Sequence, residues 1–291
     1  MKNTSSIKYR QLTDKIFFYL IILISAITIV PVALILLELI IKGHKQINFS
    51  FFTEIAPNTL EAMIAVSNNE IIPGGIINGI TGSFLMVLLA SLMAIPVGIL
   101  TGVYLSENQG KRYTNLIRTL TDILQGVPSI VLGIIGYIWI VKAVTNGFSA
   151  LAGSVALAIM MLPLIIRSTE ETLKMIPVSI KEAGVALGVP YHKVIFKLLL
   201  PTGLSGLLTG ILLSISRILG ETAPLLLTAL GSTFINWNVA KPTSAIPLLI
   251  WEFYNDPNLI DLIWSSSLLL MGFVLLINIF AKQISKKYKV F

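Results

Sequence analysis

The sequence contains no cysteine, which excludes disulfide bonds, cysteine-ligated metal sites and a thiol nucleophile. Charged residues are also scarce: they make up 12% of the 291 residues, whereas a typical soluble protein has about a quarter. Hydrophobic residues make up 55%. Because the few charges lie between long apolar runs, this composition predicts a polytopic helical membrane protein.

Motifs that bind nucleotides or carry out hydrolysis are missing as well. The chain has no GxxxxGK[ST] loop, so we expect it not to bind ATP by itself in that way. It has neither an HExxH zinc motif nor a GxSxG nucleophile motif. Its two histidines, His44 and His192, are far apart in the chain, which argues against a shared metal site. The sequence therefore predicts a protein that is not an enzyme and has no cofactor.

Six apolar segments approach the length of about 20 residues that a helix needs to cross the hydrocarbon core of a membrane. They predict an all-α membrane protein with six transmembrane helices. Prolines within or near several segments predict kinks, which a membrane helix bundle can accommodate. The first segment is too long for a signal-peptide core and lacks a clear cleavage site, so we expect it to be retained. The predicted spans are residues 16–41, 78–105, 120–141, 150–166, 203–230 and 262–281.

The distribution of lysine and arginine predicts how the chain crosses the membrane, because cytoplasmic segments are enriched in these residues. With the N-terminus inside, sixteen of the 21 lie on the cytoplasmic side, four lie outside, and Arg217 lies within a span. We therefore expect a multi-pass protein of the cell membrane, in contact with lipid, with both termini in the cytoplasm. This topology accounts for the net charge of +7 without nucleic acid.

The segments between the spans predict a division of the chain. A polar loop over residues 42–77 should lie outside the cell, and it contains Pro73-Gly74-Gly75, which is typical of a boundary. The first span is then an addition to a core of five helices. The predicted parts are an N-terminal part (1–74), a five-helix core (75–283) with a cytoplasmic loop (167–201), and a basic cytoplasmic tail (284–291).

A polar and basic stretch, Lys181–Pro201, separates two apolar spans on the expected cytoplasmic side. We interpret it as two short helices joined by a corner. Pro177 suits the first turn of one helix, and Gly188 suits its end, because glycine readily takes a left-handed conformation there. Pro190 can open the second helix, and Pro201 can limit it. Small residues in the first helix leave room for another surface to approach the backbone, so we predict a docking site.

Two charged residues lie within the fifth predicted span. Arg217 and Glu221 are four residues apart, so on a helix they share one face within pairing distance. A charge at the bilayer centre costs about 2.5–3.5 kcal/mol on insertion scales, so such residues usually face a partner or an aqueous path. The pair could fix helix packing, or it could line a permeation path in which the planar donors of Arg217 bind an oxyanion.

Arg167, Glu170 and Glu171 form a second charged group, at the inner end of the fourth predicted span. Arg167 and Glu171 are again four residues apart. We favour an interfacial salt bridge on a solvated turn as the interpretation of this group. The alternative is an inner gate or the cytoplasmic mouth of a path.

Glycine and proline mark two further structural features. Gly126-Val127-Pro128-Ser129 predicts a kink near the inner start of the third span. Gly98 and Gly102 form a GxxxG match, which in an apolar span favours close contact between helices.

The polar stretch also resembles a known signature. Glu182-Ala183-Gly184, then Gly188 after three residues, then Leu198-x-Leu200-Pro201 after nine more, is similar to the EAA signature of membrane subunits of bacterial ABC importers. Gly184 replaces the usual second alanine, and Leu198 replaces the usual isoleucine. The resemblance implies the type I permease fold of ABC importers, with coupling helices that dock on a separate ATPase subunit. The residues to which it gives this coupling role are Glu182, Ala183, Gly184, Gly188 and Pro201.

A narrower resemblance covers the chain from about residue 74 to the end of the sixth span. The stretches GGIINGITGSFLMVLLASLMAIPVGILTGVYLSE, GVPSIVLGI and SRILGETAPLL are similar to permeases of phosphate importers, and GETAPLL resembles the PstA type more than its PstC-type partner. The resemblance implies inorganic phosphate as the substrate. The implied partners are a PstC-type permease, a dimeric PstB-type ATPase and an extracellular phosphate-binding protein. The residues that it implies for the substrate path are Arg217, Glu221, Arg167 and Glu170.

Other functions are compatible with the same residues. A lone arginine does not choose among tetrahedral anions, so a permease for molybdate or sulfate is the main alternative. A secondary transporter or an integral-membrane enzyme is a further alternative. A neighbouring gene for an ATPase with a GxxxxGK[ST] loop would favour the importer.

Overall fold

The computed structural model of the protein describes residues 4–287, with side chains from residue 9 onward. Its regular structure is helical, with one isolated β-bridge between Leu230 and Thr243 in the described part of the chain. Two π-helical segments (η1, η2) and one 3-10 turn (η3) interrupt the α-helices. The elements are α1 (Thr4–Gly43), α2 (Phe49–Thr53), α3 (Thr59–Ser67), α4 (Ile77–Glu107), α5 (Arg112–Gly126), α6 (Ser129–Gly136), η1 (Tyr137–Thr145), α7 (Ala150–Met175), α8 (Val178–Ala186), α9 (Tyr191–Val194), η2 (Ile195–Leu199), α10 (Leu200–Thr202), α11 (Leu204–Leu219), α12 (Ala223–Leu226), α13 (Ile246–Phe253), η3 (Pro257–Leu259) and α14 (Ile260–Lys287).

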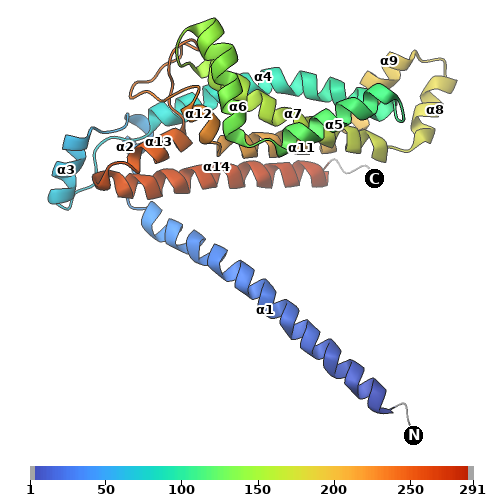
Figure 1. Ribbon diagram of the computed structural model, residues 1–291, viewed down its shortest axis with the longest axis horizontal. Coiled ribbons are helices and arrows are strands. Elements are labelled where there is room, and N and C mark those ends of the chain that lie inside the picture. Colours follow the sequence, from blue (N-terminus) through green and yellow to red (C-terminus); the bar gives the residue numbers. More distant parts are fainter. Residues whose placement is uncertain (1–3, 288–291) are drawn as a thin grey trace.

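The long helices α4, α7, α11 and α14 run side by side in one bundle (Figure 1). Within the described residues, four helices are long and apolar enough to cross a membrane, and two bent helix pairs raise the number to six if each pair is one span. The predicted all-α membrane fold is therefore confirmed. The hairpin of α8 and α9 projects at one end of the bundle, and α2 and α3 lie at the opposite end. The four single helices are Tyr9–Gly43, Ile77–Glu107, Ala150–Met175 and Pro257–Lys287.

Helix α7 lies at the centre of the bundle, because glycines let its neighbours approach it closely. Gly98 and Gly102 of α4 face Ile165 and Thr169 of α7, and a Cβ atom on Gly98 would lie 2.6 Å from the Ile165 side chain. The close helix contact predicted from this glycine spacing is therefore present. Apolar side chains continue the contact along the two helices at the density of a protein interior. They include Met86, Ala90, Leu157 and Met161.

Helix α11 approaches α7 from another side through a second pair of glycines. A Cβ atom on Gly206 would overlap the side chain of Thr172, and one on Gly210 would overlap the side chain of Ser168. Close backbone approach of this kind gains van der Waals contact, which drives association of helices in a membrane. The two glycine pairs therefore hold the second half of α7 between α4 and α11.

The third predicted span, residues 120–141, is wrong as a single helix. The chain bends by 103° between α5 and α6, at Val127 and Pro128. Pro128 has no N–H to continue a helix, and it disfavours a helical conformation in the residue before it. Val127 (ψ 130°) and Pro128 (ψ 137°) are accordingly both extended. The predicted kink is in fact a corner between two helices.

The fifth predicted span, residues 203–230, is also divided. Its predicted start at Gly203 coincides with a bend of 70° between the helical segment 191–202 and α11. Gly220 ends α11, and Pro224 lies in the first turn of the short helix α12. Glycine and proline at these positions interrupt the helix, so one apolar run gives two helices and a loop.

The loop over residues 42–77, predicted to be polar, carries two short helices and part of an apolar cluster. Phe51 of α2 and Ile72 are buried against Leu249 and Phe253 of α13. Burial of these side chains stabilises the contact between the two segments through the hydrophobic effect. The helix α13, which the sequence did not predict, is therefore tied to the segment that precedes the core.

A loop from far along the chain caps the start of α7. The first backbone N–H groups of a helix have no partner within the helix. Here the N–H of Ala150 donates to the carbonyl of Lys241 (3.0 Å), and that of Leu151 donates to the carbonyl of Val239 (2.8 Å). This end of the bundle is thus closed by hydrogen bonds between distant segments.

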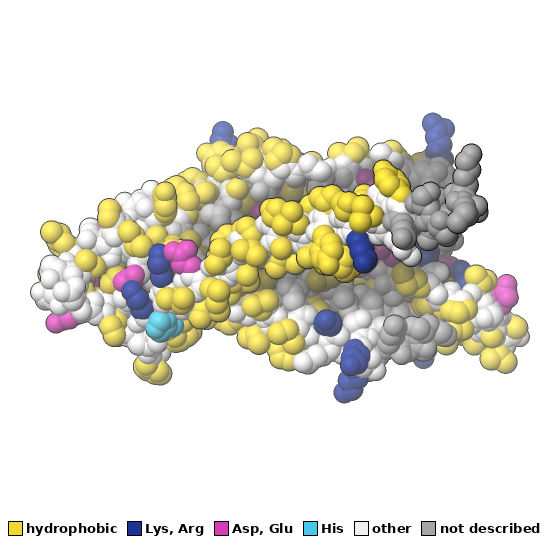
Figure 2. Space-filling model, turned by 90° about the horizontal axis from the view of Figure 1, so that it is seen from below, with side chains coloured by type: hydrophobic (Ala, Val, Ile, Leu, Met, Phe, Trp, Pro, Cys, Tyr) yellow, Lys and Arg dark blue, Asp and Glu magenta, His cyan; other side chains and the backbone are white. Residues whose placement is uncertain are grey.

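Helix α1 leaves the bundle obliquely and is exposed along nearly its whole length. Figure 2 shows its hydrophobic side chains along the visible face of the molecule. Near Gly43 it meets α14, where a Cβ atom on the glycine would lie 2.8 Å from Leu268 Cβ. Lys42 Nζ lies 4.7 Å from the ring centroid of Trp264 in the same contact. An apolar surface of this length suits a helix that is surrounded by lipid or by another chain.

Candidate functional site

The polar stretch folds as the predicted helical hairpin. Pro177 directly precedes α8, and Pro190 directly precedes α9. Gly188 forms the corner in a left-handed conformation, with φ +74°. Its N–H donates to the carbonyl of Val185 at 2.9 Å, which closes the end of α8. Glycine is therefore required at this corner for its backbone conformation.

The second arm of the hairpin ends at Thr202, one residue beyond the predicted limit at Pro201. Helical structure continues to Thr202, whose hydroxyl donates to the carbonyl of Leu198 at 2.7 Å. The π-helical segment η2 (Ile195–Leu199) directly precedes this part of the chain. A π-helical turn is wider than an α-helical one, and it accommodates the carbonyl group that loses its helical donor because proline has no N–H. The break comes at Gly203, where the chain bends into α11.

The five residues with the expected coupling role lie in different environments. Gly184 is buried, and a Cβ atom there would lie 3.2 Å from the Val194 side chain. Its small size thus lets the two arms of the hairpin pack together. Leu187, which is 83% exposed, adds an apolar side chain to the outer surface near the corner. The four exposed residues are Glu182, Ala183, Gly188 and Pro201.

An ion pair joins the hairpin to the end of α4. Lys181 of α8 pairs with Glu107, the last residue of α4, and both side chains are mostly buried. Lys181 Nζ also lies 5.2 Å from the ring centroid of Tyr191 in the second arm. One lysine therefore contacts both arms and α4. The sequence did not predict this pair, because 74 residues separate its members.

Arg217 and Glu221 form an ion pair, with 3.8 Å between Arg217 Nε and Glu221 Oε1. The predicted shared helical face is wrong, because α11 ends at Leu219 and Glu221 lies beyond it. The Arg217 side chain is 42% exposed, and the structure gives it no further partner among the described residues. Most of its donors are thus free to bind another group.

Glu170 is buried beneath three cations near the end of α7, with 1% of its side chain exposed. Its Oε1 accepts from Arg118 Nη2 (2.5 Å) and Lys174 Nζ (2.6 Å). Its Oε2 lies 3.4 Å from Arg167 Nη1. A buried carboxylate needs such partners to offset its lost hydration. The predicted solvated turn therefore does not describe Glu170.

Arg167 also pairs with Asp122 of α5, and its Nε donates to Asp122 Oδ1 at 3.1 Å. No ion pair joins Arg167 to Glu171 in the described part of the chain. Sequence reasoning missed Arg118, Asp122 and Lys174. Helical spacing was the available signal, because Asp122 follows Arg118 by four residues and Lys174 follows the buried glutamate by four.

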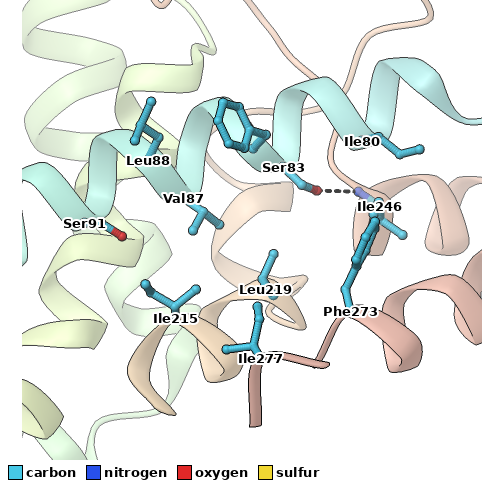
Figure 3. A pocket seen from close by; sticks show the side chains of 11 residues that line it. Ile80, Ser83, Val87, Leu88, Ser91, Ile215, Leu219, Ile246, Phe273 and Ile277 are labelled. Carbon is cyan, nitrogen blue, oxygen red and sulfur yellow. Dashed lines mark hydrogen bonds between the residues drawn. The ribbon is translucent and has the colours of Figure 1, made fainter. Parts of the chain in front are cut away.

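An apolar cavity of about 400 Å³ lies between α4, α11 and α14 (Figure 3). Ile215 and Leu219 of α11 point into it, and its described lining carries no charged side chain. Such walls return little of the hydration that an anion loses on entry, so this is not an anion site. Arg217 is two residues from Ile215 and two from Leu219, and it therefore lies on the opposite side of α11. The described residues also contain no group of three or more His, Asp or Glu that could hold a metal ion.

Comparisons with known proteins show the family of the chain. The family model "Binding-protein-dependent transport system inner membrane component" matches residues 94–290. The phosphate transport system permease protein PstA of Haemophilus influenzae is 37% identical over 251 residues, covering 85% of this chain and 85% of that protein. The protein of the same name from Yersinia pestis is 40% identical over 258 residues, covering 88% and 84%.

A solved structure shares the fold. A chain of the MetNI methionine ABC transporter, in an inward-facing conformation, is 22% identical, with a TM-score of 0.61, covering 73% of this chain and 95% of that chain. Because the identity is low, this likeness bears on the fold alone. The chain belongs to the family of binding-protein-dependent transport system inner membrane components, the permeases of ABC importers, and within it to the PstA group.

Proposed function

We propose that this chain is the permease subunit of an ATP-driven importer that moves inorganic phosphate across the cell membrane into the cytoplasm. The observation that carries the proposal is Arg217, a half-exposed guanidinium that one carboxylate holds at 3.8 Å. Its remaining donors match the geometry of a tetrahedral oxyanion. The relatives in the PstA group are named as permeases of phosphate transport systems, which favours phosphate over other oxyanions.

In this proposal Arg217 is a transient counter-ion for the anion, and Glu221 neutralises it when no anion is present. The long distance between the two side chains suits such an exchange, because no short hydrogen bond has to break. The site has to be weak, since a tight anion site would trap the ion. Arg167 and Glu170 then lie at the cytoplasmic mouth of the path.

ATP hydrolysis takes place on a separate subunit, a dimeric PstB-type ATPase that binds the exposed face of the hairpin. A PstC-type permease completes the path, and an extracellular phosphate-binding protein delivers phosphate. ATP closes the ATPase dimer, the hairpin moves with it, and the bundle opens outward. The hairpin and the last turns of α14 lie at one end of the bundle, which supports a cytoplasmic position for both (Figure 1). The N-terminus would lie on the same side.

The experiment that tests this function is phosphate uptake by the complete complex in lipid vesicles, with sulfate and molybdate as competitors. We expect ATP-dependent uptake that neither competitor suppresses. Arg217→Ala should abolish uptake, whereas Arg217→Lys should retain part of it, because lysine keeps the charge without the planar donors. Unchanged uptake by Arg217→Ala would remove this residue from the path. Strong competition by molybdate or sulfate would show that the importer does not select phosphate.

A further inference from the structure

Helix α5 has its polar side toward the bundle and its apolar side outward. Its buried residues are Thr114 and Thr121, whereas Leu116, Leu120 and Ile123 are each more than half exposed. Hydrophobic burial against the bundle therefore contributes little to its position. Polar contacts with α7 have to hold it in place.

Two ion pairs supply these contacts. Arg118 donates through Nε (3.1 Å) and Nη2 (2.5 Å) to one oxygen of Glu170, and Asp122 pairs with Arg167. Because Glu170 is buried, its pair with Arg118 is screened by water and salt less than a surface pair would be. Arg118 is therefore the main attachment of α5.

The same glutamate oxygen also binds the residue that leads into the hairpin. Lys174 lies in the last turn of α7, and its Nζ is 2.6 Å from Glu170 Oε1. Helix α8 begins at Val178, just after this turn. A movement of the hairpin that shifts the last turn of α7 can thus be passed to Arg118 and α5 through this shared oxygen.

The other end of α5 leads toward the arginine in the proposed path. Beyond the corner at Pro128, α6 packs on α12: a Cβ atom on Gly133 would lie 2.7 Å from Pro224 Cα. Pro224 follows Glu221 by three residues. Packed contacts therefore connect the hairpin with the surroundings of Arg217. Coupling along such a route requires an element that can take two positions, and a helix that ion pairs rather than apolar packing hold beside a corner can take this role.

We propose that Arg118 is a positioning residue of the transport cycle. Through Glu170 it fastens α5 to the end of α7, so that α5 and α6 follow the hairpin when the hairpin moves. This inference rests on the proposed function, since it assumes an importer whose ATPase acts on the hairpin.

The test measures phosphate taken up per ATP hydrolysed by the complete complex in vesicles. Arg118→Ala should lower this ratio by roughly fivefold or more, within the usual range of coupling between sites. Arg118→Lys should retain most of it, because lysine keeps one charged donor for Glu170. Arg112→Ala, an exposed arginine on the same helix, is the matched control and should leave the ratio unchanged. An unchanged ratio in Arg118→Ala, or an equal loss in Arg112→Ala, would overturn the inference.

A distance measurement keeps the test independent of uptake. The chain has no cysteine of its own, so spin labels can be placed on Thr119→Cys in α5 and Met175→Cys at the end of α7, both exposed positions. In complexes purified through the ATPase, we expect one narrow distance distribution with and without ATP. Arg118→Ala should broaden it. The same narrow distribution in Arg118→Ala would overturn the attachment of α5 to α7 through Arg118. A wild-type complex that hydrolyses ATP without taking up phosphate would overturn only the proposed function.

Discussion

Gly210 of α11 and Ser168 of α7 lie so close together that there is no room for a Cβ atom on the glycine. Gly210→Ala should therefore separate the two helices. Overpacking of this kind costs about 1–3 kcal/mol, so the variant should unfold at a lower temperature than the wild type. Thermal unfolding of the complex in detergent measures the difference.

Two further variants sharpen this prediction. Gly272→Ala in α14 is the matched control, because no atom lies within 4 Å of the added Cβ, and it should leave the unfolding temperature unchanged. Ser168→Gly combined with Gly210→Ala removes the side chain that overlaps and should restore much of the stability. Equal stability of Gly210→Ala and wild type would contradict the close contact.

Gly188 should be sensitive to substitution through its backbone alone. No atom lies within 4 Å of an added Cβ, but φ is +74°, a conformation that costs other residues about 1–2 kcal/mol. Gly188→Ala should therefore lower uptake per ATP hydrolysed while the chain still inserts into the membrane. Gly188→Asn should have a smaller effect, because asparagine tolerates this conformation. The same loss in both variants would argue against backbone strain as the cause.

Glu182 is expected to contribute to the surface that meets the ATPase. Glu182→Ala should lower phosphate uptake without lowering the amount of chain in the membrane, because the side chain is exposed and makes no ion pair with another described residue. Glu70→Ala is the control: this glutamate is also exposed, but it lies beyond α3, at the opposite end of the bundle. Normal uptake in Glu182→Ala would remove the residue from the coupling surface.

The ion pair between Lys181 and Glu107 should transmit force from the hairpin to α4. Lys181→Ala and Glu107→Gln should each lower uptake per ATP hydrolysed, and the double variant should be no worse than the stronger single one, because both changes remove one interaction. Lys193→Ala, an exposed lysine in the second arm, should have a smaller effect. Fully additive losses would show that the two residues act separately.

The sequence predicted the helical class, the approximate spans and the hairpin, because each follows from local composition. Long apolar runs predict helices in lipid, and Gly188 lies where a glycine is needed to turn the chain. The breaks were harder to predict. Pro128 was visible as a helix breaker, but the size of the bend depends on how α5 and α6 pack after the break.

The charged contacts could be predicted only in part. The contact of Lys174 with Glu170 could have been predicted, because the two residues are four positions apart on a helix. The pair of Arg118 with Glu170 joins residues 52 positions apart, and no local pattern indicates it. The burial of Glu170 could not be predicted either, because it depends on how α5, which carries Arg118, packs against α7. Arg217 and Glu221 were correctly paired, but the glycine between them ends the helix that was expected to hold both.

The hydrogen bonds at the start of α7 also set an order of events during synthesis. Ala150 and Leu151 are synthesised about ninety residues before Val239 and Lys241, whose carbonyls cap them. Contacts of such sequence separation form late, since loop closure has to precede them. This end of the bundle is therefore completed only after most of the chain has been made, and a chain that stops before residue 239 keeps two backbone donors of α7 without these partners.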